Sequence, residues 1–214
     1  MTHLYLIRHG ESVAQVEGFL SGHDTCRGLS DLGRAQVTAL RDRLVDTGEI
    51  QADVLLTSIL PRAIETAQII TSAIGGHEPV QDCDLCEIHP GDAEGLTWQE
   101  YQDRYWRDDY DPSKPGAPNG ESWLDFNERV ARTLRKYAEE HEGKTIVAAV
   151  HGGIIEASVN AFLDLPLGHG KLSPLVNASI TEWVHRVPEF GPQGSPRWQL
   201  VRYNDSAHLS ALRA

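Results

Sequence analysis

The chain has 214 residues, 40% of them apolar, and a formal net charge of −12. This length and composition suit one enzyme-sized domain with a substantial core, and the negative charge disfavours binding to nucleic acid or anionic lipid. The sequence has three cysteines, an odd number, and neither a signal-peptide pattern nor an apolar run of about 18 residues, so we expect a cytoplasmic protein with reduced thiols.

Strand and helix patterns alternate in the first third of the chain. Apolar, β-branched runs predict strands at residues 4 to 7 and 53 to 57. A helical pattern follows each strand, the first capped by Ser30 and the second beginning at Pro61.

Residues 79 to 120 are rich in proline and glycine, which predicts a lid or insertion rather than a continuous element. Within this segment, Trp98, Tyr101 and Tyr105 are spaced to line one side of a short helix. We interpret the segment as part of a single domain that covers residues 1 to 214.

Regular patterns return in the second half of the chain. Residues 121 to 141 predict a long amphipathic helix, residues 145 to 150 the most apolar strand, and residues 154 to 163 another helix. Two strands, at residues 180 to 187 and 198 to 203, complete the pattern. The alternation predicts an α/β fold whose mainly parallel central sheet carries helices on both faces, in three layers.

Arginines and histidines follow three of the predicted strands. Arg8 and His9 follow the first strand, Arg62 lies shortly after the second, and His151 follows the strand at residues 145 to 150. The carboxyl ends of neighbouring parallel strands meet at one edge of a sheet, so these side chains are expected to converge. Positive groups in a small space need an anion between them, and phosphate suits guanidinium donors.

Three motifs in a fixed order carry a resemblance to a known family. The segments LIRHGES, TSILPRAIETA and VHGG resemble the histidine phosphatase superfamily, also called the phosphoglycerate mutase-like fold, over residues 3 to about 165. The resemblance implies an α/β enzyme that transfers phosphoryl groups through a phosphohistidine.

The resemblance also implies a role for each polar residue of the constellation. His9 would be the nucleophile, Arg8 and Arg62 would clamp the phosphate, His151 would stabilise the transferring group, and Glu87 would be the general acid. Attack requires a neutral His9, which nearby guanidinium groups favour, whereas His151 facing a phosphate dianion is expected to be protonated. Positioning and positive charge account for phosphoryl transfer, so we predict a metal-independent enzyme without a cofactor.

Substrate contacts are expected beyond the two arginines. The other predicted substrate-binding residues are Gln15, Ser21, Gly22, Gly152 and Trp98. The mutases of the family usually carry asparagine at the place of Gln15, arginine at Phe19, tyrosine at Pro90, lysine near Trp98, an arginine pair at Arg107-Asp108 and asparagine at Gly153. Because several substrate-binding cations of the mutases are missing, the sequence favours a phosphatase.

The favoured function is therefore a phosphoric monoester hydrolase that acts on a small phosphorylated metabolite. A cofactor-dependent phosphoglycerate mutase and a non-catalytic phospho-ligand binder on the same fold are the alternatives. The predicted partner is the small substrate, not nucleic acid or a membrane, and a homodimer is compatible with the sequence. Whether Glu87 or Glu94 supplies the proton is left open.

Arg62 and the cysteine pair each have a simpler structural interpretation. Arg62 could pair with Glu65 on its own helix, an interaction worth less than about 1 kcal/mol. Cys83 and Cys86 have the spacing of half a zinc knuckle or of a redox pair, but without a second pair they are expected to be incidental thiols.

Overall fold

The computed structural model describes residues 1–109, 111–167, 174–188 and 194–212. Within these residues six strands form one sheet in the order β3-β2-β4-β1-β5-β6. The strands are β1 (Thr2–Arg8), β2 (Val54–Thr57), β3 (Val80–Gln81), β4 (Thr145–Val150), β5 (Ile180–Arg186) and β6 (Arg197–Asp205). The pairs β1–β4, β2–β4 and β2–β3 are parallel, whereas β5 pairs antiparallel with β1 and β6. The predicted mainly parallel sheet is confirmed.

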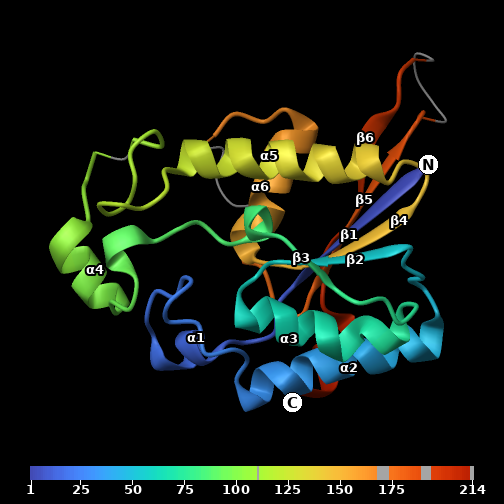
Figure 1. Ribbon diagram of the computed structural model, residues 1–214, viewed down its shortest axis with the longest axis horizontal. Coiled ribbons are helices and arrows are strands. Elements are labelled where there is room, and N and C mark those ends of the chain that lie inside the picture. The colour runs from blue at the N-terminus through green and yellow to red at the C-terminus, as the bar shows by residue number, and fades with distance from the viewer. Residues whose placement is uncertain (110, 168–173, 189–193, 213–214) are drawn as a thin grey trace.

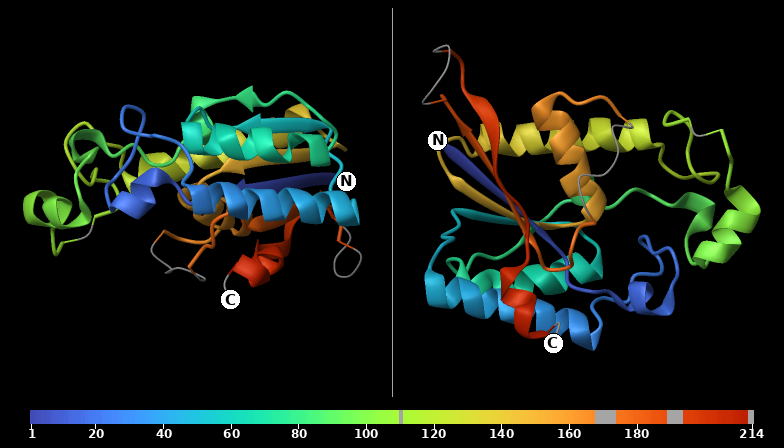
Figure 2. Two further views of the ribbon diagram at one scale, coloured as in Figure 1. Left: turned by 90° about the horizontal axis from the view of Figure 1, so that it is seen from below. Right: turned by 180° about the vertical axis from the view of Figure 1, so that it is seen from behind.

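Helices cover both faces of this sheet, as predicted. The α-helices are α1 (Val13–Glu17), α2 (Asp31–Thr47), α3 (Pro61–Ile70), α4 (Trp98–Tyr105), α5 (Trp123–Glu140) and α6 (Gly152–Leu163). Short 3-10 turns are η1 (Thr71–Ala73), η2 (Cys83–Leu85), η3 (Gly91–Ala93) and η4 (Ala207–Leu212). Helices α2 and α3 lie on one face and α5 and α6 on the other, while α1 and α4 project beyond the carboxyl ends of the parallel strands (Figures 1 and 2).

The core has two halves because β1 is buried on both faces. Leu4 and Leu6 pack into the half that contains α5 and α6, whereas Tyr5 and Ile7 pack into the half that contains α2 and α3. Alternate side chains of a strand point to opposite faces, which produces this division. A strand packed on both sides holds the residues at its carboxyl end, Arg8 and His9, in a fixed position.

Local signals place the helix ends of the first βα unit. The Ser30 hydroxyl accepts a hydrogen bond from the Gly33 amide at 3.0 Å and so caps α2. Gly48 ends α2 with a φ of 60°, a left-handed conformation that suits glycine. Helix α3 begins at Pro61, as predicted, but ends at Ile70 and continues as the tighter turn η1.

Short elements escaped the sequence analysis. The two-residue strand β3 is exposed and pairs only with the edge of β2, so it has no apolar pattern of its own. The segment at residues 79 to 120, expected to form a lid or insertion, begins in the sheet with β3 and later carries α4, which projects beyond the sheet (Figure 1). Five-residue α1 depends on a capping box in which Ser12 and Gln15 bond each other's backbone amides.

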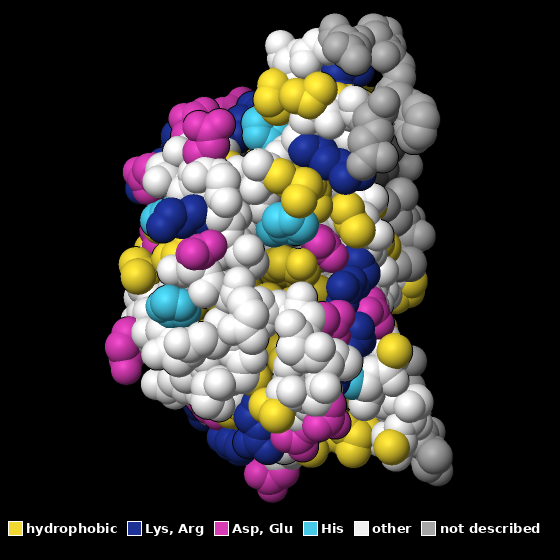
Figure 3. Space-filling model, turned by 90° about the vertical axis from the view of Figure 1, so that its right-hand side faces the viewer, with side chains coloured by type: hydrophobic (Ala, Val, Ile, Leu, Met, Phe, Trp, Pro, Cys, Tyr) yellow, Lys and Arg dark blue, Asp and Glu magenta, His cyan; other side chains and the backbone are white. Residues whose placement is uncertain are grey.

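The face of the molecule at the amino ends of the parallel strands carries acidic and basic side chains interspersed with one another (Figure 3). None of the helices in the described ranges combines the length and the apolar character needed to cross a bilayer.

Candidate active site

Two histidines face each other at the carboxyl ends of neighbouring strands. In the register of β1 and β4, Arg8 is paired with Val150, so His9 and His151 follow at adjacent positions. Their ring centroids lie 5.2 Å apart at an interplanar angle of 61°. His9 is 5% exposed and His151 is fully buried. The topology thus brings together side chains separated by more than half of the chain.

The protonation of His9 suits a nucleophile. Its Nδ1 lies 2.6 Å from the carbonyl oxygen of Gly10, and because that oxygen can only accept, Nδ1 carries the proton and Nε2 keeps its lone pair. Burial lowers the pKa of His9 well below its usual value, and the charges of Arg62 and Arg8 lower it further. His9 is therefore a neutral imidazole with a free Nε2.

His151 has the opposite tautomer. Arg62 Nε donates to His151 Nδ1 at 3.3 Å, so the proton of this ring resides on Nε2. Burial, Arg62 and His9, in that order, lower the pKa of His151 well below its usual value. Without a bound anion the ring is therefore neutral, and its Nε2–H is an uncharged donor; the expected protonation of His151 concerns the phosphate-bound state and stays a prediction. A phosphate dianion beside it would raise this pKa.

The two arginines approach the histidines from different elements. Arg8 Nη1 donates to the Leu175 carbonyl. Arg62 Nη1 lies 3.4 Å from the Ser21 carbonyl oxygen and 3.3 Å from Cys26 Sγ. Burial lowers the pKa of Arg8, and the positive charge of Arg62 adds to this effect.

The alternative pairing of Arg62 with Glu65 is not formed. Glu65 instead makes an ion pair with Arg34, at 3.1 Å, and accepts a hydrogen bond from the Leu29 amide at 3.3 Å. Arg62, which is 5% exposed, therefore belongs to the histidine cluster and not to a surface ion pair.

Three buried donor groups of this site have no hydrogen-bond partner among the described residues. They are Arg8 Nε, His151 Nε2 and Ser21 Oγ. Buried polar groups are nearly always hydrogen-bonded, so a cluster of exceptions calls for an explanation. Unpaired N–H donors beside two guanidinium groups form a binding site for an oxyanion with several acceptor atoms.

Glu87 lies at the amino end of α6, next to the histidine that precedes this helix. Its Oε2 accepts from the Gly153 amide at 3.0 Å and its Oε1 from the Ile88 amide at 3.1 Å. Both carboxylate oxygens are thus held in place by backbone amides. A Cβ atom at residue 153 would overlap with Glu87 Oε1, so this position of Glu87 requires glycine there.

Glu94, the rival acid, is engaged elsewhere. Its Oε1 accepts from the amides of Gly22, Asp24 and Thr25 and from the Thr25 hydroxyl, at 2.8 to 3.0 Å. Burial alone would raise the pKa of Glu94, but the hydrogen bonds from Thr25, Asp24 and Gly22 outweigh it and lower the pKa. Glu94 is thus an ionised carboxylate that holds a loop in place. Because it carries no proton, it is unsuited to act as a general acid.

The same loop is fastened to the segment before α4 by backbone contacts. The Leu20 amide donates to Leu96 O at 2.9 Å, and the Gly95 amide donates to Leu20 O at 2.8 Å. Phe19 and Thr97 form an isolated antiparallel bridge. Residues 19 to 25 and 94 to 97, called here the fastened loop pair, thus form one unit beside the histidines.

A match to known proteins identifies the family of the chain. Residues 4–206 match the histidine phosphatase superfamily (branch 1). The chain belongs to this superfamily.

Relatives within the superfamily have different activities. Phosphoglycerate mutase-like protein 4 of Arabidopsis thaliana is 33% identical over 96% of this chain and 86% of its own. Glucosyl-3-phosphoglycerate phosphatase of Mycolicibacterium vanbaalenii is 30% identical over 97% of this chain and 96% of its own. The solved phosphoserine phosphatase of Entamoeba histolytica, in complex with 3-phosphoglyceric acid, has a TM-score of 0.76 and is 27% identical; the match covers 98% of this chain and 100% of that chain. The predicted histidine-phosphatase type of enzyme is confirmed by the family match and by these phosphatases.

A cavity of about 820 Å³ opens beside the cluster of this histidine phosphatase. Its lining residues are Arg8, Glu87, Ile88, Trp98, Trp123, Gly152, Gly153, Glu156, Pro174 and Leu175. Three predicted substrate-binding residues, Arg8, Gly152 and Trp98, belong to this lining, and Trp98 is 53% exposed. Aromatic rings and carboxylates thus surround the space next to Arg8.

The other predicted substrate-binding residues lie elsewhere. Ser21 and Gly22 line a second cavity of about 250 Å³, which Glu87 also reaches. Gln15 is outside the lining of both cavities: its Oε1 accepts from the Ser12 amide at 3.0 Å and from Asn177 Nδ2 at 3.1 Å.

Residues near the start of β5 were missed by the sequence analysis. Asn177 Nδ2 donates to His9 O at 3.1 Å, and the Leu175 carbonyl accepts from Arg8. Because β5 runs antiparallel to β1, the chain that enters β5 lies at the carboxyl end of β1. The signal that could have found Asn177 is a polar residue just before a predicted strand.

Proposed function

We propose that this histidine phosphatase hydrolyses small phosphoric monoesters through a phosphohistidine on His9. One observation carries the proposal: a neutral His9 with its proton on Nδ1 faces a neutral His151 with its proton on Nε2, beside two guanidinium groups. One ring offers a lone pair and the other an N–H donor, as attack on phosphorus requires.

The reaction follows from these positions in two steps. The phosphoryl oxygens accept hydrogen bonds from Arg8, Arg62 and His151 Nε2–H. His9 Nε2 attacks phosphorus, the bond to the leaving oxygen breaks in line, and the leaving alkoxide takes a proton from Glu87. Water then attacks the phosphohistidine, Glu87 takes a proton from that water, and phosphate leaves as His9 regains its lone pair.

Glu87 is the proposed acid because it lines the cavity together with Arg8. The amides of Gly153 and Ile88 hold its carboxylate in place. Glu87 donates its proton to the leaving oxygen in the first step and takes one from water in the second.

The cavity favours hydrolysis over mutase chemistry. A mutase must hold a bisphosphorylated acid, whose second phosphate needs further cations. Among the described lining residues Arg8 is the single cation, and Glu87 and Glu156 are acidic. We therefore propose that the cavity takes the body of one monoester against Trp98 and Trp123, with α4 as its lid.

Phosphate release is the first test. The protein is incubated with phosphoserine, 3-phosphoglycerate, sugar phosphates and an aryl phosphate, and orthophosphate is measured. With 3-phosphoglycerate, the product is analysed in the presence and absence of 2,3-bisphosphoglycerate. We expect free phosphate in both conditions. Accumulation of 2-phosphoglycerate that depends on 2,3-bisphosphoglycerate would show that the protein is a mutase instead. If no ester is turned over, the non-catalytic phospho-ligand binder is the remaining interpretation.

The covalent intermediate is the second test. Rapid acid-free quenching during turnover of the best ester should trap a base-stable, acid-labile phosphoprotein. His9→Ala should abolish both this species and turnover, whereas the control His141→Ala, far from the site, should retain both. Normal turnover by a folded His9→Ala variant would disprove the mechanism.

A further inference from the structure

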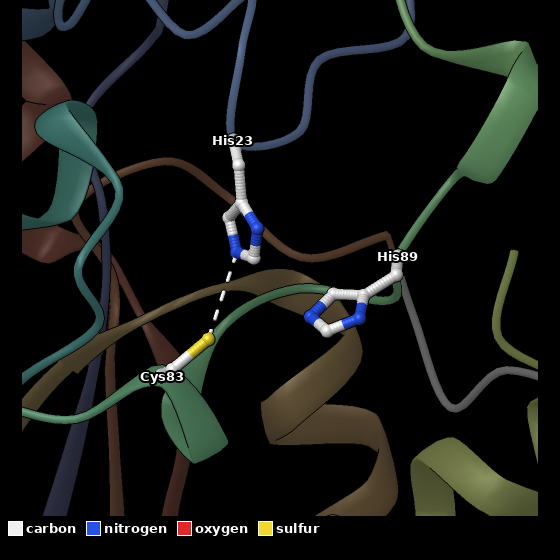
Figure 4. Close-up of side chains that lie close together, drawn as sticks. All are labelled: His23, Cys83 and His89. Carbon is white, nitrogen blue, oxygen red and sulfur yellow. Dashed lines mark hydrogen bonds between the residues drawn. The ribbon is translucent and has the colours of Figure 1, made fainter.

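Three potential metal ligands converge near the second cavity from three separate segments. His23 lies in the loop between α1 and α2, Cys83 begins η2, and His89 precedes η3. One ligand atom from each residue lies within 4.8 Å of the other two (Figure 4). His23 and His89 also line the second cavity, which gives an ion access from solvent.

We propose that His23, Cys83 and His89 form a Zn²⁺ site with a water molecule as the fourth ligand. A thiolate and two imidazoles are the ligands preferred by Zn²⁺, whereas Mg²⁺ and Ca²⁺ prefer oxygen. None of the three ligands is a phosphoryl-transfer residue of the proposed mechanism, although Glu87 lines the same cavity, so a bound ion would add to the chemistry of His9 and not replace it.

The geometry of the cluster is close to that of a bound ion. Zinc bond lengths at a tetrahedral angle imply an S···N separation of about 3.5 Å and an N···N separation of about 3.3 Å. Cys83 Sγ lies 3.7 Å from His23 Nε2, and the two imidazole centroids are 4.9 Å apart. The three ligand atoms lie within 4.8 Å of one another, so binding requires His89 to approach the other two ligands, which a side-chain rotation supplies.

No hydrogen bond has to be broken for His89 Nε2 to bind a metal. This nitrogen is buried and has no partner among the described residues, which is unusual for a buried polar atom. Zinc would displace the thiol proton of Cys83 on binding.

Cys86 is the competing ligand, because Cys83 and Cys86 have the spacing of half a zinc knuckle. The structure argues for the histidines instead. Cys86 is fully buried and its sulfur accepts from Ser58 Oγ at 3.2 Å. Cys83 is exposed, and its sulfur faces His23. The two cysteines therefore provide a matched pair of variants.

A bound ion would join two segments of the active site. His23 is two residues from Ser21, whose carbonyl contacts Arg62, and His89 is two residues from Glu87. Zinc would tie the first half of the fastened loop pair to the segment that carries the proposed acid.

The experiment is a zinc competition titration on the intact protein. After treatment with a chelator and a reductant, the wild type, Cys83→Ser, Cys86→Ser and His23→Asn are titrated against a chromophoric zinc chelator, and Co²⁺ spectra are recorded. We expect one tight equivalent in the wild type, with a thiolate-to-Co²⁺ charge-transfer band. Loss of an outer partner of a ligand costs about 10- to 100-fold in affinity, so loss of a ligand should cost at least about tenfold in Cys83→Ser and His23→Asn. Cys86→Ser should bind like the wild type.

Three results would overturn the proposal. The first is no zinc binding by the wild type, and the second is an unchanged zinc affinity in Cys83→Ser. The third is a lower zinc affinity in Cys86→Ser with an unchanged affinity in His23→Asn, which would indicate that the cysteine pair binds the metal. Melting temperatures without metal check that each variant is folded. Cys83 and His23 are exposed, so their replacement should leave the fold intact, and either variant alone decides the role of its residue.

Discussion

Substitution of Arg62 separates two effects that this side chain has on the histidines. Its Nε–H holds His151 in one tautomer, and its positive charge lowers the pKa of both His9 and His151, second only to burial. Arg62→Lys keeps the charge but loses the Nε–H bond and the planar fork. Arg62→Met removes the charge as well.

The expected magnitudes follow from these interactions. A hydrogen bond that involves a charged group is worth about 1.5–3 kcal/mol, so Arg62→Lys should lower kcat/KM by about 10- to 150-fold. Arg62→Met should lower kcat/KM by about 10²- to 10³-fold, the loss that is typical when a donor that stabilises developing charge is removed. Only Arg62→Met should also raise the pKa of His9, because one of the two opposing charges is gone.

The assay is kcat/KM against pH for the wild type and both variants, with one substrate, so that the ionisation of the ester is common to all three. Attack requires unprotonated His9, so activity is lost as the pH falls through the His9 pKa. The acid limb should move to higher pH in Arg62→Met and stay in place in Arg62→Lys. An acid limb that moves equally in both variants, or wild-type kcat/KM in Arg62→Lys, would refute the reasoning.

Three further expectations test other parts of the site. Gly153→Ala should displace Glu87 and lower turnover of alkyl phosphates by about 10²- to 10⁴-fold while sparing aryl phosphates with good leaving groups; equal losses would contradict an acid role for Glu87. Glu94→Gln should lower the Tm at neutral pH. The folded pKa of Glu94 is lowered, so this difference is fully present above the ordinary value of 4.5 and is lost as the pH falls through the folded value; a difference independent of pH would contradict the role of its charge. Orthophosphate at 100 times its Kd should stabilise the protein by about 2.7 kcal/mol and raise the Tm by about 5–10 °C; an equal rise in Arg8→Ala would exclude Arg8 from the anion site.

The convergence of Arg8, His9, Arg62 and His151 could be predicted because it depends on strands with clear patterns. Residues 4 to 7 and 145 to 150 are apolar enough to be recognised as buried strands, and parallel neighbours place the residues that follow them at one edge. This inference needs only the order of the elements and no knowledge of loop paths.

The remaining contacts depend on loop paths that no local pattern encodes. From the sequence alone Glu94 is a candidate general acid. The fold excludes it, because four hydrogen-bond donors from residues about 70 positions earlier in the chain lie beside its carboxylate. Asn177 reaches His9 only because β5 runs antiparallel to β1. The tautomers of His9 and His151 follow from single acceptor and donor atoms, Gly10 O and Arg62 Nε, whose positions a sequence does not give.

The fastened loop pair has a consequence for redesign of specificity. Ser21 in its first half touches the guanidinium of Arg62, and its second half leads directly into Trp98, the aromatic wall of the large cavity. Replacing α4 with the equivalent helix of another enzyme would therefore also disturb the position of Arg62. A chimaera that changes substrate specificity without loss of activity has to exchange both segments of the fastened loop pair together.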